Sequence, residues 1–116
     1  MSPEELKKRT RNFGVRVIKM IDHLPKTRAA NIIANQVVRS ATSIGANYRE
    51  ACRARSNKEF ISKIGISEGE ADETLYWLEI IIESKMIKEE LLEDLIKEAN
   101  ELLAIFVASS KTAKKH

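Results

Sequence analysis

A line of arginines runs along one face of the segment 27–54. Arg39, Arg49 and Arg53 recur at the three- and four-residue spacing of an α-helix, and Glu50 is the only acidic residue in this segment. Guanidinium groups present forked donors that match phosphate oxygens. The pattern therefore predicts a surface that binds the phosphates of a nucleic acid without reading its bases. The candidate residues are Arg28, Arg39, Arg49, Arg53, Arg55 and Lys58.

Small polar residues lie beside the apolar stripe of the same segment. They are spaced by three, four and three residues, so a helix places them in one row. Such residues are poor choices for the edge of a helix core unless they make hydrogen bonds across a helix contact. We therefore expect a structural polar seam between helices or subunits, and not a catalytic set. Its members are Ser40, Ser43, Asn47 and Glu50.

The segment 57–85 carries apolar residues on two faces, and the second face includes adjacent tyrosine and tryptophan. A helix with two apolar faces is usually buried on both, whereas a lone four-helix bundle covers only one. Aromatic residues are enriched in interfaces, and Gly65 and Gly69 would let another helix approach closely. We expect self-association through this second face. The predicted interface residues are Ile66, Gly69, Tyr76, Trp77 and Ile80.

The chain offers few residues for catalysis or metal binding. Its only histidines, His23 and His116, belong to no Glu-x-x-His pair of the kind that binds two irons in a helix bundle. Arg16 and His23 have an Arg-x6-His spacing similar to that of HEPN-type helical ribonucleases, but Val17 follows the arginine where those enzymes prefer a polar residue. Cys52 has no histidine within a helical turn to activate it. We expect no enzyme activity, no metal and no cofactor.

Start and stop signals place these residues on four helices. Ser2, Thr27 and Ser56 can each cap a helix N-terminus, and Pro25 breaks the chain before the second helix. Short connections require antiparallel neighbours. We predict an all-α protein with a single domain over residues 1–116, folded as an antiparallel up-down-up-down four-helix bundle. The helices are expected at about residues 3–23, 27–54, 57–85 and 88–110, followed by a frayed basic tail.

The formal net charge of +3 hides an uneven distribution. Residues 1–63 hold 14 Lys/Arg and 5 Asp/Glu, whereas residues 64–116 hold 6 Lys/Arg and 12 Asp/Glu. Two interpretations fit this split. Either the basic helices pack beside the acidic fourth helix and the charges mix, or the basic residues form a surface for nucleic acid.

Several features indicate the cellular compartment. The single cysteine cannot form an internal disulfide. No apolar run approaches the roughly 20 residues that a membrane span requires, and the first residues lack the apolar centre of a signal peptide. We therefore expect a cytoplasmic protein with no membrane partner.

Two stretches of the sequence point to a family. The stretch "VVRSATSIGANYREA", followed by "SNKEFISKIGISEGEADETLYWLE", resembles the four-helix bundle proteins encoded in 23S rRNA intervening sequences. The resemblance rests on the row of small polar residues in the first stretch, on Lys58-Glu59-Phe60 and on the segment 73–79, and it covers most of the chain. The turn after the third helix reads Lys85-Met86-Ile87, where many relatives carry a glycine.

The resemblance implies an antiparallel four-helix bundle and a ring-like homo-oligomer, a pentamer. It also implies kinship with the accessory protein of diversity-generating retroelements, which binds nucleic acid and partners a reverse transcriptase. We therefore expect a non-enzymatic oligomer that binds nucleic acid, RNA before DNA, with a reverse transcriptase or another protein as partner. The alternative is a structural or adaptor oligomer that binds a protein partner and no nucleic acid.

Overall fold

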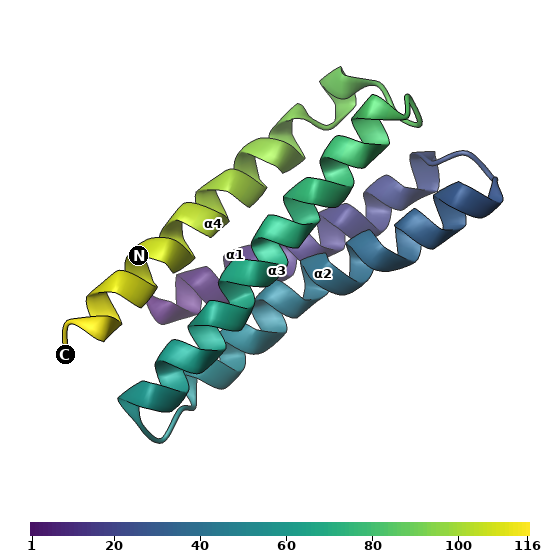
Figure 1. Cartoon of the computed structure of the whole chain (residues 1–116). Helices are drawn as coiled ribbons and strands as arrows, with labels where there is room; N and C mark the ends of the chain where they lie inside the picture. Colours follow the sequence, from purple (N-terminus) through teal and green to yellow (C-terminus); the bar gives the residue numbers. More distant parts are fainter.

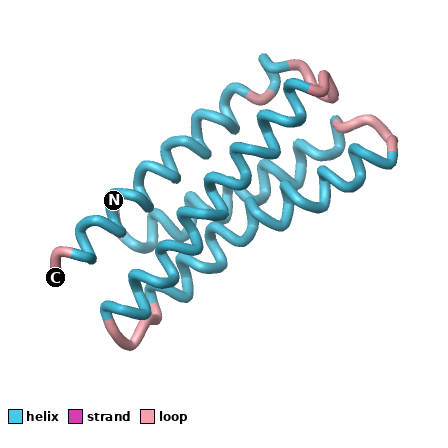
Figure 2. The backbone as a smooth tube through the Cα atoms, in the orientation of Figure 1, coloured by secondary structure: helices cyan, strands magenta, loops and turns pink.

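The chain folds into four long helices that pack side by side and alternate in direction, as a computed structural model describing residues 1–116 shows (Figure 1). The predicted all-α, antiparallel up-down-up-down four-helix bundle is confirmed. The molecule measures 47 × 22 × 21 Å, and only short loops connect the helices (Figure 2). The elements are α1 (Pro3–Met20), η1 (Ile21–His23), α2 (Arg28–Cys52), α3 (Asn57–Glu83), η2 (Glu89–Leu91) and α4 (Glu93–Lys114).

The predicted N-terminal caps are present at three helices. Ser2 Oγ accepts a hydrogen bond from the amide of Glu5, and Ser56 Oγ accepts one from the amide of Glu59, each at 3.1 Å. Thr27 Oγ1 accepts from the amide of Ala30 at 3.2 Å. Each bond satisfies one of the amides that a helix start leaves without a partner. These caps explain why the starts of the first three helices were predictable within one residue.

The fourth helix lies later in the chain than predicted. A short 3-10 turn, η2, precedes α4, which begins at Glu93 and continues to Lys114. The expectation of a frayed tail after residue 110 is wrong, because Ala113 is buried and its carbonyl accepts a hydrogen bond from Asn57 Nδ2 at 2.9 Å. The apolar spacing of α4 continues through Ser110 to Ala113, so burial against α3 holds the last turn in place.

A single apolar core runs the length of the bundle. Twenty buried apolar residues from all four helices and the α3–α4 connection form one cluster. Phe13, Tyr48 and Phe106 are its only buried aromatic members, and aliphatic side chains fill the rest. No helix of this bundle is both long enough and apolar enough to cross a membrane.

The turn after α3 forces Lys85 into a left-handed conformation, with φ of 60°. The amide of Met86 bonds the carbonyl of Ile81, and that of Lys85 bonds the carbonyl of Ile82, which is the Schellman pattern at a helix end. This left-handed conformation favours glycine, because a residue with a Cβ atom is strained there. The structure thus gives a physical reason why glycine suits this turn.

We expect Lys85→Gly to raise the free energy of unfolding by about 0.5–1 kcal/mol, because relief of left-handed strain exceeds the extra flexibility of the unfolded chain. Urea denaturation of the two proteins measures the change. Lys85→Ala is the control, since it removes the same side chain but retains the strain. If both variants gained the same free energy of unfolding, loss of the lysine side chain and not relief of backbone strain would be the cause.

Candidate nucleic-acid interface

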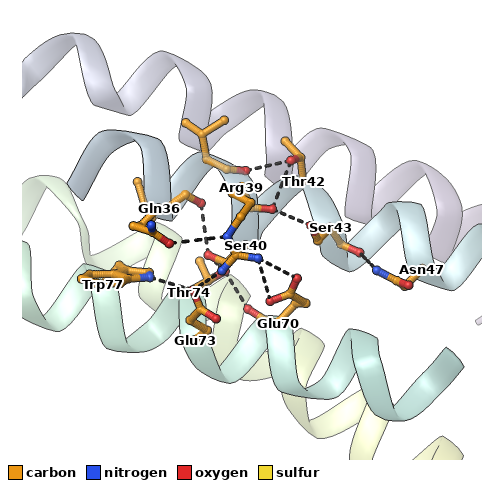
Figure 3. Close-up of polar contacts among 12 residues, drawn as sticks. Gln36, Arg39, Ser40, Thr42, Ser43, Asn47, Glu70, Glu73, Thr74 and Trp77 are labelled. Carbon is orange, nitrogen blue, oxygen red and sulfur yellow. Dashed lines mark hydrogen bonds and ion pairs between the residues drawn. The ribbon is translucent and has the colours of Figure 1, made fainter. Parts of the chain in front are cut away.

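Arg39 does not present a free guanidinium to solvent, contrary to the expectation for the arginine line. Its Nη1 lies 3.0 Å from a carboxylate oxygen of Glu70, and its Nη2 forms a second ion pair with Glu73 (Figure 3). Both carboxylates come from α3. Glu50 is the only acidic residue of α2 itself, and the acidic partners of Arg39 come from the neighbouring helix. Arg39 therefore joins α2 to α3, and its guanidinium is already engaged by two carboxylates within the subunit.

The electrostatics of this cluster favour its charged forms. The pKa of Glu73 is lowered because the indole N–H of Trp77 donates to its carboxylate at 3.0 Å and because the Arg39 guanidinium lies beside it. The pKa of Arg39 is raised, mainly by its hydrogen bond to Glu73. Trp77, predicted as part of an exposed interface, is half-buried and has its N–H satisfied within the subunit.

We expect Glu73→Gln to lower the free energy of unfolding at pH 7 by less than about 1 kcal/mol, because the carboxylate is partly exposed and screened. The folded pKa lies below the ordinary value of 4.5. The stabilisation is therefore present above that value and is lost as the pH falls through the folded pKa. Urea denaturation at pH 7 and pH 3 should show the difference between the proteins shrinking at the lower pH. Glu90→Gln, at an exposed position with no ion pair, should show little difference at either pH.

The other basic candidates remain exposed and form no ion pair. Arg49 lies near the end of α2, Arg53 caps its C-terminus, and Arg55 and Lys58 flank the turn into α3. None of their side chains has a carboxylate partner. Arg28 starts α2, so it lies about 37 Å from Arg53 at 1.5 Å per residue. Arg28 thus shares a helix face with the others but belongs to the opposite end of the bundle.

Lysines of α4 join these residues at the same end of the molecule. The α2–α3 turn and both chain termini lie toward one end of the bundle (Figure 1), and the bond from Asn57 to Ala113 ties the start of α3 to the last turn of α4. These lysines were not predicted as part of the surface, because a frayed tail gives them no fixed position. The spacing from Phe106 to Ala113 nevertheless indicates that the helix continues. We define the basic end as Arg53, Arg55, Lys58, Lys111, Lys114 and Lys115, all exposed.

Glu50 and Glu59 lie near the basic end, but neither forms an ion pair with one of its residues. Glu59 accepts a hydrogen bond from the backbone amide of Arg55 at 3.3 Å. Glu50 pairs with Lys63 at 3.5 Å. The positive charge of the basic end is therefore not neutralised by ion pairs within the subunit, and it can attract an anion.

The polar row on α2 follows the α2–α3 contact (Figure 3). Ser40 is fully buried and accepts a hydrogen bond from Thr74 Oγ1 at 2.9 Å. Ser43 and Asn47 differ from the expectation of bonds across the contact, since each donates to a carbonyl of its own helix. A further member that the sequence analysis did not identify is Ser67, whose hydroxyl donates to the carbonyl of Ile44 at 2.9 Å. The bonds of Ser40 and Ser67 therefore join α2 to α3.

The second face of α3 is exposed in the single subunit. Tyr76 is 53% exposed and Ile66 is also exposed, while Ile80 is half-buried. Nothing lies within 4 Å of a Cβ added at Gly65 or Gly69. The two glycines therefore make no close helix contact within the subunit, and the space beside them is open to another molecule.

Comparison with protein families matches residues 4–108 to the family described as 23S rRNA-intervening sequence protein. The chain belongs to this family. A solved structure of a protein of unknown function from the S23 ribosomal protein family of Bacteroides thetaiotaomicron is 35% identical, with a TM-score of 0.84. The match covers 90% of this chain and 97% of that chain. Comparison with curated proteins finds no match.

This intervening-sequence protein has a second polar region between α1 and α4. Arg9 forms a bidentate ion pair with Glu98, in which Nη2 and Nε lie 2.6 and 2.7 Å from the two carboxylate oxygens. Within the subunit it is therefore α1, and not α2, that forms ion pairs with the acidic fourth helix. Arg16 and His23 line a neighbouring cavity of about 340 Å³ with Asp94 and aliphatic side chains. No group of three or more His, Cys, Asp or Glu side chains is placed to hold a metal ion.

Proposed function

We propose that this intervening-sequence protein is a non-enzymatic, homo-oligomeric accessory protein that binds RNA through phosphate contacts at its basic end. The observation that carries the proposal is the cluster of exposed basic side chains without carboxylate partners, defined above. Arginine and lysine there come from the α2–α3 turn and from the last turn of α4. Because these side chains lie together, one end of the elongated bundle carries a positively charged surface.

The chemistry of the basic end favours backbone contacts over base recognition. Phosphate contacts fix a protein on a nucleic acid, whereas recognition of sequence requires groups that reach the base edges. The neighbouring aromatic side chain, Phe60, is half-buried and packs against the core, so it offers no platform on which bases could stack. We therefore propose binding that depends on the shape and charge of the RNA more than on its sequence.

Self-association would multiply these contacts. The exposed face of α3, centred on Tyr76 and Ile66, supports a homo-oligomer, and the resemblance to the accessory proteins described above suggests a pentamer. Each copy would contribute one basic end. Several weak sites on one assembly bind a long anion more tightly than one site does, because the later contacts form at high effective concentration.

The test is fluorescence anisotropy of a labelled structured RNA at about 50 and 200 mM salt. We expect binding at the lower salt that weakens steeply at the higher salt, since phosphate contacts release counterions. A duplex DNA of equal length tests the choice of nucleic acid. Absence of binding at 50 mM salt would overturn the proposal and favour a structural or adaptor oligomer, which would then be sought through its protein partner.

A further inference from the structure

A second apolar surface lies on another side of the bundle, between α1 and α2. It is a groove of about 280 Å³. Val15 and Ile18 line it and are 48% and 47% exposed. Gly14, Gly45 and Ala46 also line it, and their small size makes it concave. We call this surface the α1–α2 groove.

The exposed face of α3 carries the large side chain of Tyr76 together with two glycines. Tyr76 projects from it, and Gly65 and Gly69 leave open space along the same helix. Ile66, one turn from Gly69, is also exposed. We call this surface the α3 ridge. A projecting aromatic side chain and a groove lined by small residues are complementary in shape.

The charges beside the two surfaces are also complementary. Arg11 and Arg49 line the α1–α2 groove, and neither forms an ion pair. On the α3 ridge, Asp72, Glu79 and Glu83 lie one or two helical turns from Tyr76, and all three are exposed and unpaired. Contact between two copies of the ridge would bring these carboxylates together, which is unfavourable. Contact between ridge and groove would place carboxylates beside guanidinium groups.

We propose that the α3 ridge of one copy packs into the α1–α2 groove of a second copy. This inference rests on the proposed self-association and specifies its geometry. Two different surfaces then meet at each contact, so the assembly is heterologous and every copy uses both surfaces. A heterologous contact generates a ring or a chain, whereas a pairing of identical faces would stop at a dimer.

The test uses two variants that each disable one surface. Tyr76→Glu places a charge on the ridge, and Ile18→Glu places one in the groove; both positions are about half exposed, so the subunit should still fold. Each purified variant should be monomeric by size-exclusion chromatography with light scattering. A 1:1 mixture should form a heterodimer, because the intact groove of one variant can accept the intact ridge of the other.

Matched controls are Asn12→Glu on α1 and Ala104→Glu on α4, both exposed outside the two surfaces, and both should assemble like the unmodified protein. Circular dichroism confirms folding of every variant. If Ile18→Glu still assembles, or if the mixture remains monomeric, the ridge-in-groove contact is wrong. If the unmodified protein is itself monomeric, the proposed self-association fails as well, whereas RNA binding by the monomer would still support the basic end.

Discussion

Replacing Arg53, Lys58 and Lys114 together by glutamine should weaken RNA binding by about 10- to 100-fold at low salt. The three side chains come from the end of α2, the start of α3 and the last turn of α4. All are exposed and unpaired, so their removal leaves no buried charge and should not disturb folding. The loss therefore reports phosphate contacts directly.

The salt dependence gives a second measure of the same loss. Each phosphate contact contributes about 0.7–0.9 to the slope of log affinity against log salt, so three lost contacts should reduce the slope by about 2–3. The matched control replaces Lys19, Lys26 and Lys88 by glutamine at the opposite end, with the same change in net charge. These lysines are exposed and form no ion pair. Equal losses in both triple variants would show that net charge, and not the basic end, governs binding.

The helices and their starts were predictable because the signals are local. Ser2, Thr27 and Ser56 each cap the helix that follows within the next three residues. The start of α4 has no such side-chain cap, and the 3-10 turn before it is set by burial of Ile87 and Leu92 in the core. The predicted start of this helix was about five residues too early. The burial of Ile87 and Leu92 depends on helices that are distant in the sequence, so no local pattern marks it.

The arginines of α2 show why ion pairs between helices could not be predicted from the sequence. A helical projection places Arg39 and Arg49 on one side of α2, but it does not show which neighbouring helix lies beside each. Glu70 and Glu73 are more than 30 residues away in sequence and reach Arg39 only because α3 packs against α2. The alternative of pairing with helix 4 fails for α2 within the subunit, since α2 packs between α1 and α3. Ion pairs thus follow from the packing of helices and not from one helix alone.

Gly45→Ala should lower the free energy of unfolding by about 1–2 kcal/mol, although alanine is the better helix former. A Cβ at position 45 would lie 2.9 Å from Thr10 Oγ1 and 3.1 Å from Thr10 Cβ, where α1 and α2 cross. Thr10 is buried, and its hydroxyl donates to the carbonyl of Leu6 at 2.9 Å. The threonine cannot move without losing that contact, so the helices must separate. The cost of overpacking, about 1–3 kcal/mol, should exceed the gain of about 1 kcal/mol in helix propensity.

The exposed helix glycine Gly65 is the matched control, because a Cβ there meets nothing within 4 Å. In the Tyr76→Glu background, which is expected to be monomeric, Gly65→Ala should raise the free energy of unfolding by about 0.5–1 kcal/mol in urea denaturation. Thr10→Ala combined with Gly45→Ala should recover part of the loss, since the nearest atom is then absent. A Gly45→Ala protein as stable as the parent would show that the α1–α2 crossing adapts without cost. The same crossing forms the floor of the α1–α2 groove, so a separation of the two helices should also weaken assembly if the ridge of a second copy packs there.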